Sequence, residues 1–162
     1  MITYYDSPFG TIELRANTNA LTHLYFVSDE EKINKTHTTP KNSILKTAVK
    51  QLIQYFSGDR HTFNLPLEPQ GTPFQQKVWQ TLQTINYGET QSYAWLAKMI
   101  NNPKAVRAVG RANGANPISI IIPCHRIIGA NGTLTGYAGG LALKEQLLNL
   151  EGAKFIAAHQ KG

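Results

Sequence analysis

Residues 92–111 read SYAWLAKMINNPKAVRAVGR, a stretch that predicts two short helices around a break. The first helix is expected from about Ser92 to Ile100, and Asn101-Asn102-Pro103 ends it because proline cannot continue a helix. The second helix begins near Lys104. This arrangement is typical of a helix-turn-helix, although many other helical proteins also contain two short helices around a break.

The second of these helices carries a basic stripe. Lys104, Arg107 and Arg111 are spaced i, i+3 and i+7 and share one face, while Val106 and Val109 are expected to point toward a core. Nearly all the other residues are alanine or glycine, so the helix can approach a phosphate-lined groove closely. Alternatively, the small residues serve helix packing and the basic side chains are merely solvated.

The distribution of charge favours an anionic partner. The net charge is +6, and residues 72–162 hold nine Lys/Arg against three Asp/Glu, whereas residues 1–71 hold seven of each. A basic half of this kind indicates nucleic acid as the first candidate partner. No apolar run approaches the roughly 20 residues that span a membrane, and no secretory signal is visible, so we expect a cytoplasmic protein without a membrane partner.

Residues 1–65 predict a small α/β domain. Strands are expected at residues 2–5, 11–16 and 21–26, and they form an antiparallel meander. Apolar residues then recur at helical spacing from Ile44 to Phe56, and this helix should cover one face of the sheet. Residues 66–72, with two prolines and a glycine, suit an extended linker.

Residues 73–162 predict a mainly helical domain, so the whole chain is expected to be of the α+β class. The stretch 72–75 has a capping-box spacing with proline at the first helical position, and its helix should stop at Asn86. The β-branched run Ile118–Ile122 should be an extended, buried segment. A last helix is expected from about Leu141 to Leu150. Glu151 ends it, where an anion is disfavoured, so its carboxylate is expected to have a partner.

Cys124, in Pro123-Cys124-His125-Arg126, is the only cysteine in the 162 residues. One thiol forms neither an internal disulfide nor a multi-cysteine zinc site, so it either reacts or packs. Neighbouring cations favour the thiolate, which is the nucleophile, whereas a lone buried cysteine often acts as a small hydrophobe. Adjacent side chains of an extended segment point apart, so His125 reaches Cys124 only around a bend or through a water.

Several segments together resemble the O6-alkylguanine-DNA alkyltransferases, also called methylated-DNA–protein-cysteine methyltransferases. The similarity extends from about Phe74 to Gly152, and the motifs occur in the family's order. They are Tyr93, the run 102–110, Asn116-Pro117, the run 123–128, the run 137–142 and Lys144-Glu145.

This resemblance implies direct reversal of DNA damage. The helix-turn-helix enters the minor groove of double-stranded DNA, the O6-alkylguanine is flipped out, and the cysteine takes the alkyl group irreversibly, once per molecule. O4-alkylthymine is a further candidate substrate. The resemblance also implies an N-terminal domain that is ribonuclease H-like in outline and a winged-helix-like second domain. We expect a monomer with no cofactor and no metal.

The family's catalytic roles map onto four motif positions. Cys124 would be the alkyl acceptor, His125 would act as its base through a water, and Glu151 would orient His125. Asn116 would brace the active-site loop.

The remaining roles concern DNA and the base pocket. Tyr93 would help to rotate the phosphate and protonate the leaving guanine, and Arg107 would fill the gap left by the flipped base. Further DNA contacts are expected at Lys104, Arg111 and Arg126, and pocket residues are expected at Tyr137, Ala138, Ile127 and Ser119.

Two of these positions depart from familiar members. Ala138 stands where many members have a serine that bonds the guanine oxygen, and Ser119 stands where some have a proline that packs on bulky adducts.

Two other functions remain open at this stage. A cysteine hydrolase would recycle the thiol, but no peptidase-type signature surrounds it. A non-catalytic sensor of alkylated DNA could share the fold, although in such proteins the acceptor cysteine is replaced.

Overall fold

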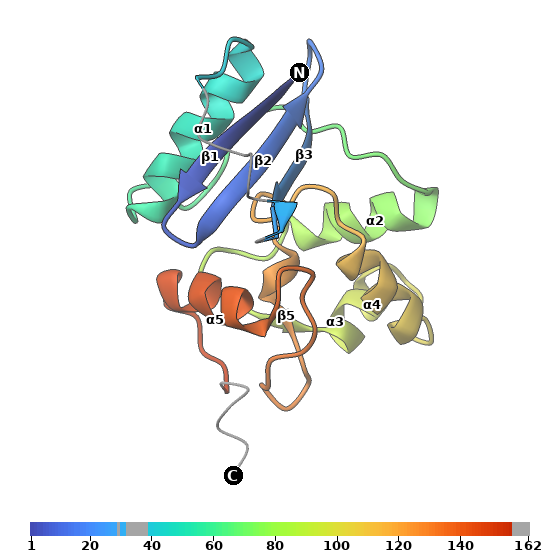
Figure 1. The fold of residues 1–162 in the computed structure, drawn as a ribbon. Helices are drawn as coiled ribbons and strands as arrows, with labels where there is room; N and C mark the ends of the chain where they lie inside the picture. Colours follow the sequence, from blue (N-terminus) through green and yellow to red (C-terminus); the bar gives the residue numbers. More distant parts are fainter. Residues whose placement is uncertain (29, 32–38, 157–162) are drawn as a thin grey trace. The chain divides into compact units, whose positions relative to one another are not determined.

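The computed structural model describes residues 1–28, 30–31 and 39–156, and the contacts within it divide the chain into two units. The first comprises residues 1–70 with 117–119, and the second comprises residues 71–116 with those from 120 onward. Figure 1 shows the helices and strands of both units. The predicted α+β class is confirmed.

The first unit is built on an antiparallel meander, as predicted. Its strands are β1 (Ile2–Ser7), β2 (Gly10–Ala16) and β3 (Leu21–Phe26), in the order β1-β2-β3. In the register of this sheet, Ile12 lies opposite both Tyr5 and Phe26. Because side chains alternate along a strand, these three residues share one face of the sheet.

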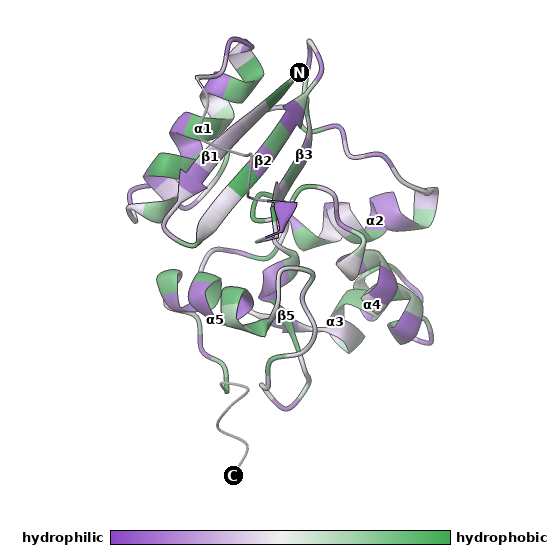
Figure 2. Cartoon of the chain, in the orientation of Figure 1, coloured by the Kyte–Doolittle hydropathy of each residue, from purple (hydrophilic) through white to green (hydrophobic). Residues whose placement is uncertain are grey.

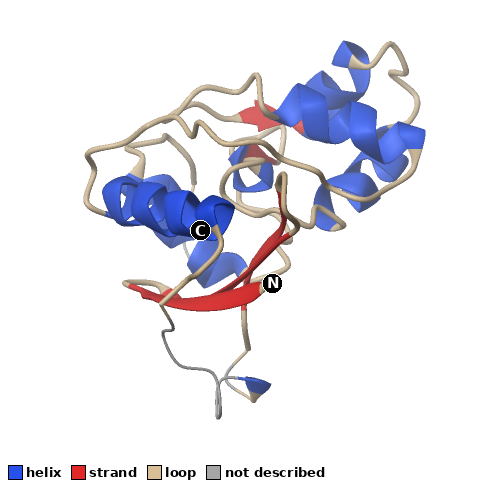
Figure 3. Cartoon of the chain, turned by 90° about the horizontal axis from the view of Figure 1, so that it is seen from above, coloured by secondary structure: helices blue, strands red, loops and turns tan. Residues whose placement is uncertain are grey.

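The helix α1 (Ser43–Phe56) covers that face, as Figure 3 shows. Asn42 caps it, since its side-chain oxygen accepts a hydrogen bond from the Leu45 amide at 2.9 Å. Apolar and polar residues alternate around α1 in Figure 2, and the apolar side is buried. The Phe56 ring lies 6.4 Å from the Tyr5 ring, which fixes α1 on the face of Tyr5 and Ile12.

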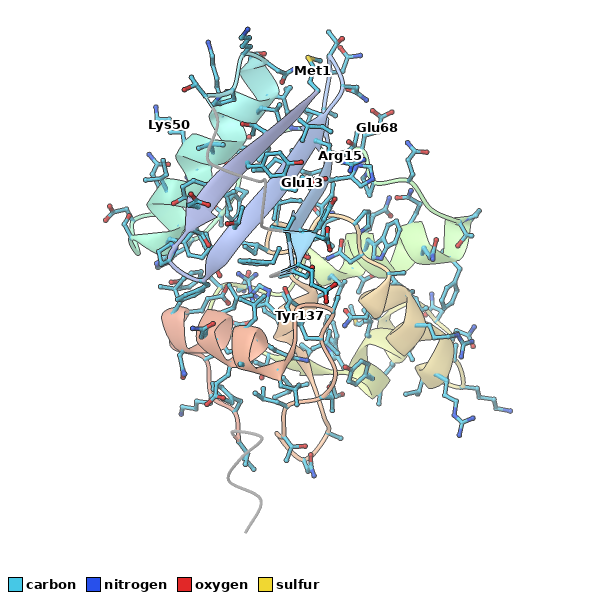
Figure 4. The ribbon with its side chains drawn as sticks, viewed as in Figure 1. Met1, Glu13, Arg15, Lys50, Glu68 and Tyr137 are labelled. Atoms are coloured by element: carbon cyan, nitrogen blue, oxygen red, sulfur yellow. The ribbon has the colours of Figure 1, made fainter. Side chains whose placement is uncertain are left out.

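The opposite face of the sheet carries a buried carboxylate. Glu13 is only 1% exposed and accepts hydrogen bonds from Tyr4 at 2.9 Å, from Arg15 at 2.7 Å and from Tyr25. Figure 4 shows Glu13 beside Arg15 on the sheet. Burial opposes ionisation, but the hydrogen bonds from Tyr25, Arg15 and Tyr4 outweigh it and lower the pKa of Glu13.

The predicted linker is partly paired with β3. The Leu21 amide donates to the Pro66 carbonyl at 2.9 Å, and the Glu68 amide donates to the Leu21 carbonyl at 2.8 Å. Residues 117–119 also pair with β3, because the Leu24 amide donates to Pro117 and the Leu24 carbonyl accepts from Ser119. These two short segments satisfy backbone groups that an edge strand would otherwise expose.

The prediction of an extended run at Ile118–Ile122 is wrong, although its burial is correct. Only Ile118 pairs with β3, and the chain then turns through residues 119–121. Ile120 has a φ of 71°, a conformation that costs a β-branched residue energy and that the surrounding buried contacts must hold. The turn directs the chain toward Cys124.

The second unit contains the predicted helices, and the last of them has the predicted bounds. They are α2 (Pro73–Leu82), α3 (Tyr93–Met99), α4 (Val106–Gly114) and α5 (Leu141–Leu150). The strands β4 (Gln91–Ser92) and β5 (Ile127–Ile128) form a short parallel pair. The capping box at the start of α2 is present, but α2 ends at Leu82 rather than at Asn86.

The helix-turn-helix of α3 and α4 differs from the prediction at the second helix. Ala105 is the N-cap of α4, so Lys104 precedes the helix and does not lie on it. Val106 is 37% exposed rather than directed into a core, whereas Val109 is buried. The Trp79 indole of α2 donates to the Ala112 carbonyl at 2.8 Å and holds α4 against α2.

In the part of the chain that the structure describes, no helix combines the length and apolarity needed to cross a membrane.

Candidate active site

Cys124 is the first residue of a short 3₁₀ helix, η2 (Cys124–Arg126), and is only 6% exposed. Two asparagine side chains, one on α4 and one just after it, hold the segment around Cys124 in place. The Asn116 side chain donates to the Ile122 carbonyl at 2.7 Å, and the Asn113 side chain donates to the Cys124 carbonyl at 3.3 Å. Hydrogen bonds to backbone carbonyls therefore hold in place the turn that carries the thiol.

Glu151 has the partners that its position at the end of α5 led us to expect. Its carboxylate lies 2.8 Å from His125 Nε2, and Arg126 donates to it twice, at 2.8 Å from Nε and at 3.0 Å from Nη2. The remaining guanidinium nitrogen of Arg126 donates to the Ile85 carbonyl at 2.7 Å. A planar guanidinium suits this bidentate pairing. All three ionisable side chains are buried.

These contacts decide which nitrogen of His125 is basic. Burial lowers the pKa of His125 and favours the neutral ring. Burial opposes ionisation of Glu151, but His125 and Arg126 outweigh it and hold the pKa of Glu151 well below its usual range. We therefore assign the ring hydrogen to Nε2, donating to Glu151. Nδ1 is then an acceptor, and it is buried without a hydrogen-bond partner among the described residues.

The thiol of Cys124 is protonated in this resting state, because burial raises its pKa. The Asn116 side chain, the charge of Lys144 and Tyr137 act in the opposite direction. A reaction at sulfur therefore needs a base, and the open Nδ1 of His125, on the next residue, is chemically suited to that role.

Lys144 also belongs to this site, although its motif predicted no role for it. It is 0% exposed, and its ammonium donates to the carbonyls of Ile127 at 2.5 Å and Thr135 at 3.1 Å. Burial lowers its pKa to about 8, although the Cys124 thiolate would raise it. Its spacing was the available signal, since Lys144 lies three and four residues before the buried Leu147 and Leu148.

Tyr93 is the first residue of α3 and connects α4 with the segment before α5. Its hydroxyl lies 2.6 Å from the Thr135 hydroxyl. A methyl group built on Gly110 would lie 3.7 Å from the Tyr93 ring, so the ring packs on the small-residue side of α4.

The basic residues of the helix-turn-helix are exposed. Arg107 and Arg111 lie one turn apart on α4, and Lys104 lies in the turn before it. Val106 adds an exposed apolar side chain beside them.

Arg126 lies elsewhere, and this requires a correction. The prediction that Arg126 contacts DNA conflicts with its burial and with its hydrogen bonds to Glu151 and Ile85. A phosphate would reach it only if the pair with Glu151 opened, which would leave that carboxylate buried without its cation. We therefore remove Arg126 from the candidate DNA contacts.

The predicted pocket residues are placed differently from one another. Tyr137 is half-buried in the segment before α5, where Figure 4 labels it, and Ala138 is exposed. The Ile127 carbonyl holds Lys144, as described above. Ser119 belongs to the first unit, where its amide pairs with Leu24, so its pocket role stays a prediction.

Among the described residues, no group of three or more His, Cys, Asp or Glu side chains is placed to hold a metal ion.

A buried thiol with a histidine–carboxylate pair, in the same unit as an exposed basic helix-turn-helix, is the combination expected of a DNA-binding protein with a reactive cysteine. Comparison with known families agrees. Residues 73–153 match the DNA binding domain of 6-O-methylguanine DNA methyltransferase, and residues 1–69 match the ribonuclease-like domain of the same family. The chain belongs to this family.

Individual relatives support the same conclusion. A methylated-DNA–protein-cysteine methyltransferase of Methanosarcina acetivorans is 49% identical over 92% of this chain and 96% of its own length. One from Haemophilus influenzae is 47% identical over 95% of this chain and 87% of its own. The crystal structure of Mycobacterium tuberculosis OGT in complex with DNA has a TM-score of 0.83 at 46% identity, covering 93% of this chain and 92% of that one.

Proposed function

We propose that this protein repairs double-stranded DNA by transferring the alkyl group of O6-alkylguanine directly and irreversibly to Cys124. One observation carries the proposal: the only cysteine of the chain directly precedes a neutral, buried His125 whose Nε2 is held by Glu151. The names of the relatives at 47–49% identity support a methylated-DNA–protein-cysteine methyltransferase activity.

The geometry suits transfer to a thiolate generated in place. His125 Nδ1 takes the thiol proton through a water, and Glu151 stabilises the resulting imidazolium. The sulfur then forms a bond to the alkyl carbon as the carbon–O6 bond breaks. The electron pair of the broken bond remains on the guanine. Tyr93 donates its hydroxyl proton to a guanine ring nitrogen, so that the guanine leaves as a neutral base. The thioether is stable, so each molecule reacts once.

DNA binding is assigned to the exposed basic surface of the helix-turn-helix. The helix α4 enters the minor groove, Arg107 occupies the place of the extruded base, and Lys104 and Arg111 contact phosphates. The small residues of α4 permit this close approach. The DNA complex of the Mycobacterium tuberculosis relative supports DNA as the partner.

The flipped base is read by the segment around Cys124. The carbonyls of Cys124 and Ile127 accept from the guanine amino group, while Tyr137 and Ala138 line the pocket. Repair of O4-alkylthymine, a monomeric state and a cytoplasmic location stay predictions.

Intact mass after incubation with a duplex containing one O6-methylguanine tests the proposal. We expect a gain of one methyl group per protein molecule, located on Cys124, and none in Cys124→Ser. Release of product beyond one equivalent would indicate a hydrolase. DNA binding without any mass change would indicate a sensor, and either result would overturn the proposal.

A further inference from the structure

Thr135 links the two halves of the proposed active site. Its hydroxyl lies 2.6 Å from the Tyr93 hydroxyl, and its carbonyl accepts from the buried Lys144 ammonium at 3.1 Å. The same ammonium donates to the Ile127 carbonyl at 2.5 Å, and Ile127 follows the Cys124–Arg126 helix directly. Thr135 thus contacts both the phenol at the start of α3 and the buried ammonium of Lys144.

The segment that carries Thr135 is held by backbone hydrogen bonds on both sides of this residue. Two residues earlier, the Thr133 carbonyl accepts from the Gly129 amide at 2.9 Å. Two residues later, the Tyr137 carbonyl accepts from the Gly140 amide at 2.9 Å. Together with the Lys144 contact, these bonds give Thr135 a fixed position from which its short side chain reaches Tyr93.

We propose that Thr135 is a positioning residue for alkyl transfer, whose hydroxyl orients the Tyr93 hydroxyl for proton donation to the leaving guanine. The proposal rests on the proposed function. In the resting structure either hydroxyl can be the donor. In the reacting complex Tyr93 gives its proton to the guanine, so Thr135 must then be the donor.

The chemistry explains why this donor matters. As sulfur bonds to the alkyl carbon and the carbon–O6 bond breaks, the electron pair passes to the guanine, and the Tyr93 proton moves to a ring nitrogen. The phenol oxygen gains negative charge during that transfer, and the Thr135 hydroxyl donates a hydrogen bond to it. The phenolate later recovers a proton from the solvent, to which the His125 imidazolium releases the proton that it took from the thiol.

Replacing the hydroxyl by a methyl group tests the proposal with little change of volume. Thr135→Val should slow single-turnover transfer on an O6-methylguanine duplex about threefold to tenfold, the effect of losing one hydrogen bond. Thr135→Ser should restore the rate to within about twofold. Thr133→Val is the matched control, because its hydroxyl bonds Asn131 in the same segment and does not contact Tyr93.

A double-mutant cycle with Tyr93→Phe separates positioning from folding. If Thr135 acts through the phenol, Thr135→Val should have no further effect in the Tyr93→Phe background. Equal slowing in both backgrounds, or an unchanged rate in Thr135→Val, would overturn the inference. If Thr135→Val lowers the melting temperature, Thr135→Ala and Thr135→Ser measured below both transitions decide the same question, since only the serine retains the hydroxyl.

Failure of the proposed function itself would look different. The wild-type protein would then gain no methyl group on Cys124, and no rate would exist to compare. A wild type that is methylated once, with all Thr135 variants equally fast, would refute only the role of Thr135.

Discussion

Arg126 and Lys144 lie inside the second unit, whereas Arg107 and Arg111 lie on its surface. The two buried cations make short contacts: Arg126 binds Glu151, and Lys144 binds two backbone carbonyls. Arg107 and Arg111 are solvent-exposed on α4. The same charge therefore serves two different purposes in one unit.

The difference shows that burial, rather than charge, decides what a cation can do. A buried cation affects the protonation of its neighbours: Arg126 helps His125 to lower the pKa of Glu151, and Lys144 opposes the burial that raises the pKa of Cys124. An exposed cation is screened within about 8 Å at physiological salt, so it acts mainly on a polyanion that approaches it. Substitutions in the two groups should accordingly be seen in different measurements.

The largest effect is expected for Arg126→Met. This change leaves Glu151 buried without its bidentate partner, and breaking a buried pair costs about 3–5 kcal/mol of unfolding free energy. Arg111→Met is the surface control and should change stability by less than about 0.5 kcal/mol. Urea unfolding of both variants makes the comparison. Similar losses would show that burial does not separate the two arginines.

The pH dependence of stability should reveal Lys144. Burial lowers its pKa from 10.5 to about 8 in the folded protein, so the unfolded chain binds more protons between these values. Between pH 8 and 10.5 the wild-type side chain should therefore become less destabilising, by up to about 3 kcal/mol relative to Lys144→Met.

Both proteins are best compared in a Cys124→Ser background, because a Cys124 thiolate would raise the pKa of Lys144 and couple the two titrations. Lys50→Met, which replaces an exposed lysine of α1, is the control and should run parallel to its parent. A Lys144→Met curve that is also parallel would show that the ammonium is not desolvated.

Arg107→Ala should slow repair of an alkylated duplex by about tenfold or more, while reaction with the free alkylated base stays nearly unchanged. Unpairing and unstacking a base cost a few kcal/mol, and each 1.36 kcal/mol left uncompensated is tenfold in rate. Single-turnover rates on duplex, single strand and free base test this. Equal losses on all three would mean that Arg107 shapes the pocket rather than replacing the flipped base.

The sequence was sufficient for the elements whose periodicity is local. The three-stranded meander and α1 follow from alternation and helical spacing, and Thr72 supplies the expected cap of α2. The turn at Ile120 was not predictable, because β-branched residues favour extended backbone and only tertiary contacts hold the φ of 71°.

The candidate site shows the same limit. The motifs predicted roles for Cys124, His125 and Glu151, but Arg126 was expected to contact DNA. Its pairing partner lies 25 residues away and the Ile85 carbonyl 41 residues away, so its burial depends on contacts that no local pattern encodes. A buried role for Lys144 was not predicted, because a lysine is usually assigned to the surface even where its neighbours on the helix are apolar.

The smallest effect should come from the exposed cations. If Lys104 and Arg111 contact phosphates, each replacement by alanine should reduce the slope of log K against log salt by about 0.9 for unmodified duplex. The exposed Lys50 of α1, labelled in Figure 4, is a control in the first unit, and Lys50→Ala should leave the slope unchanged. A slope lowered equally by all three substitutions would show that net charge alone governs binding. A slope lowered by neither Lys104→Ala nor Arg111→Ala would show that these side chains are solvated and do not contact phosphates. The exposed cations would then differ from Arg126 and Lys144 in burial but would have no function of their own in DNA binding.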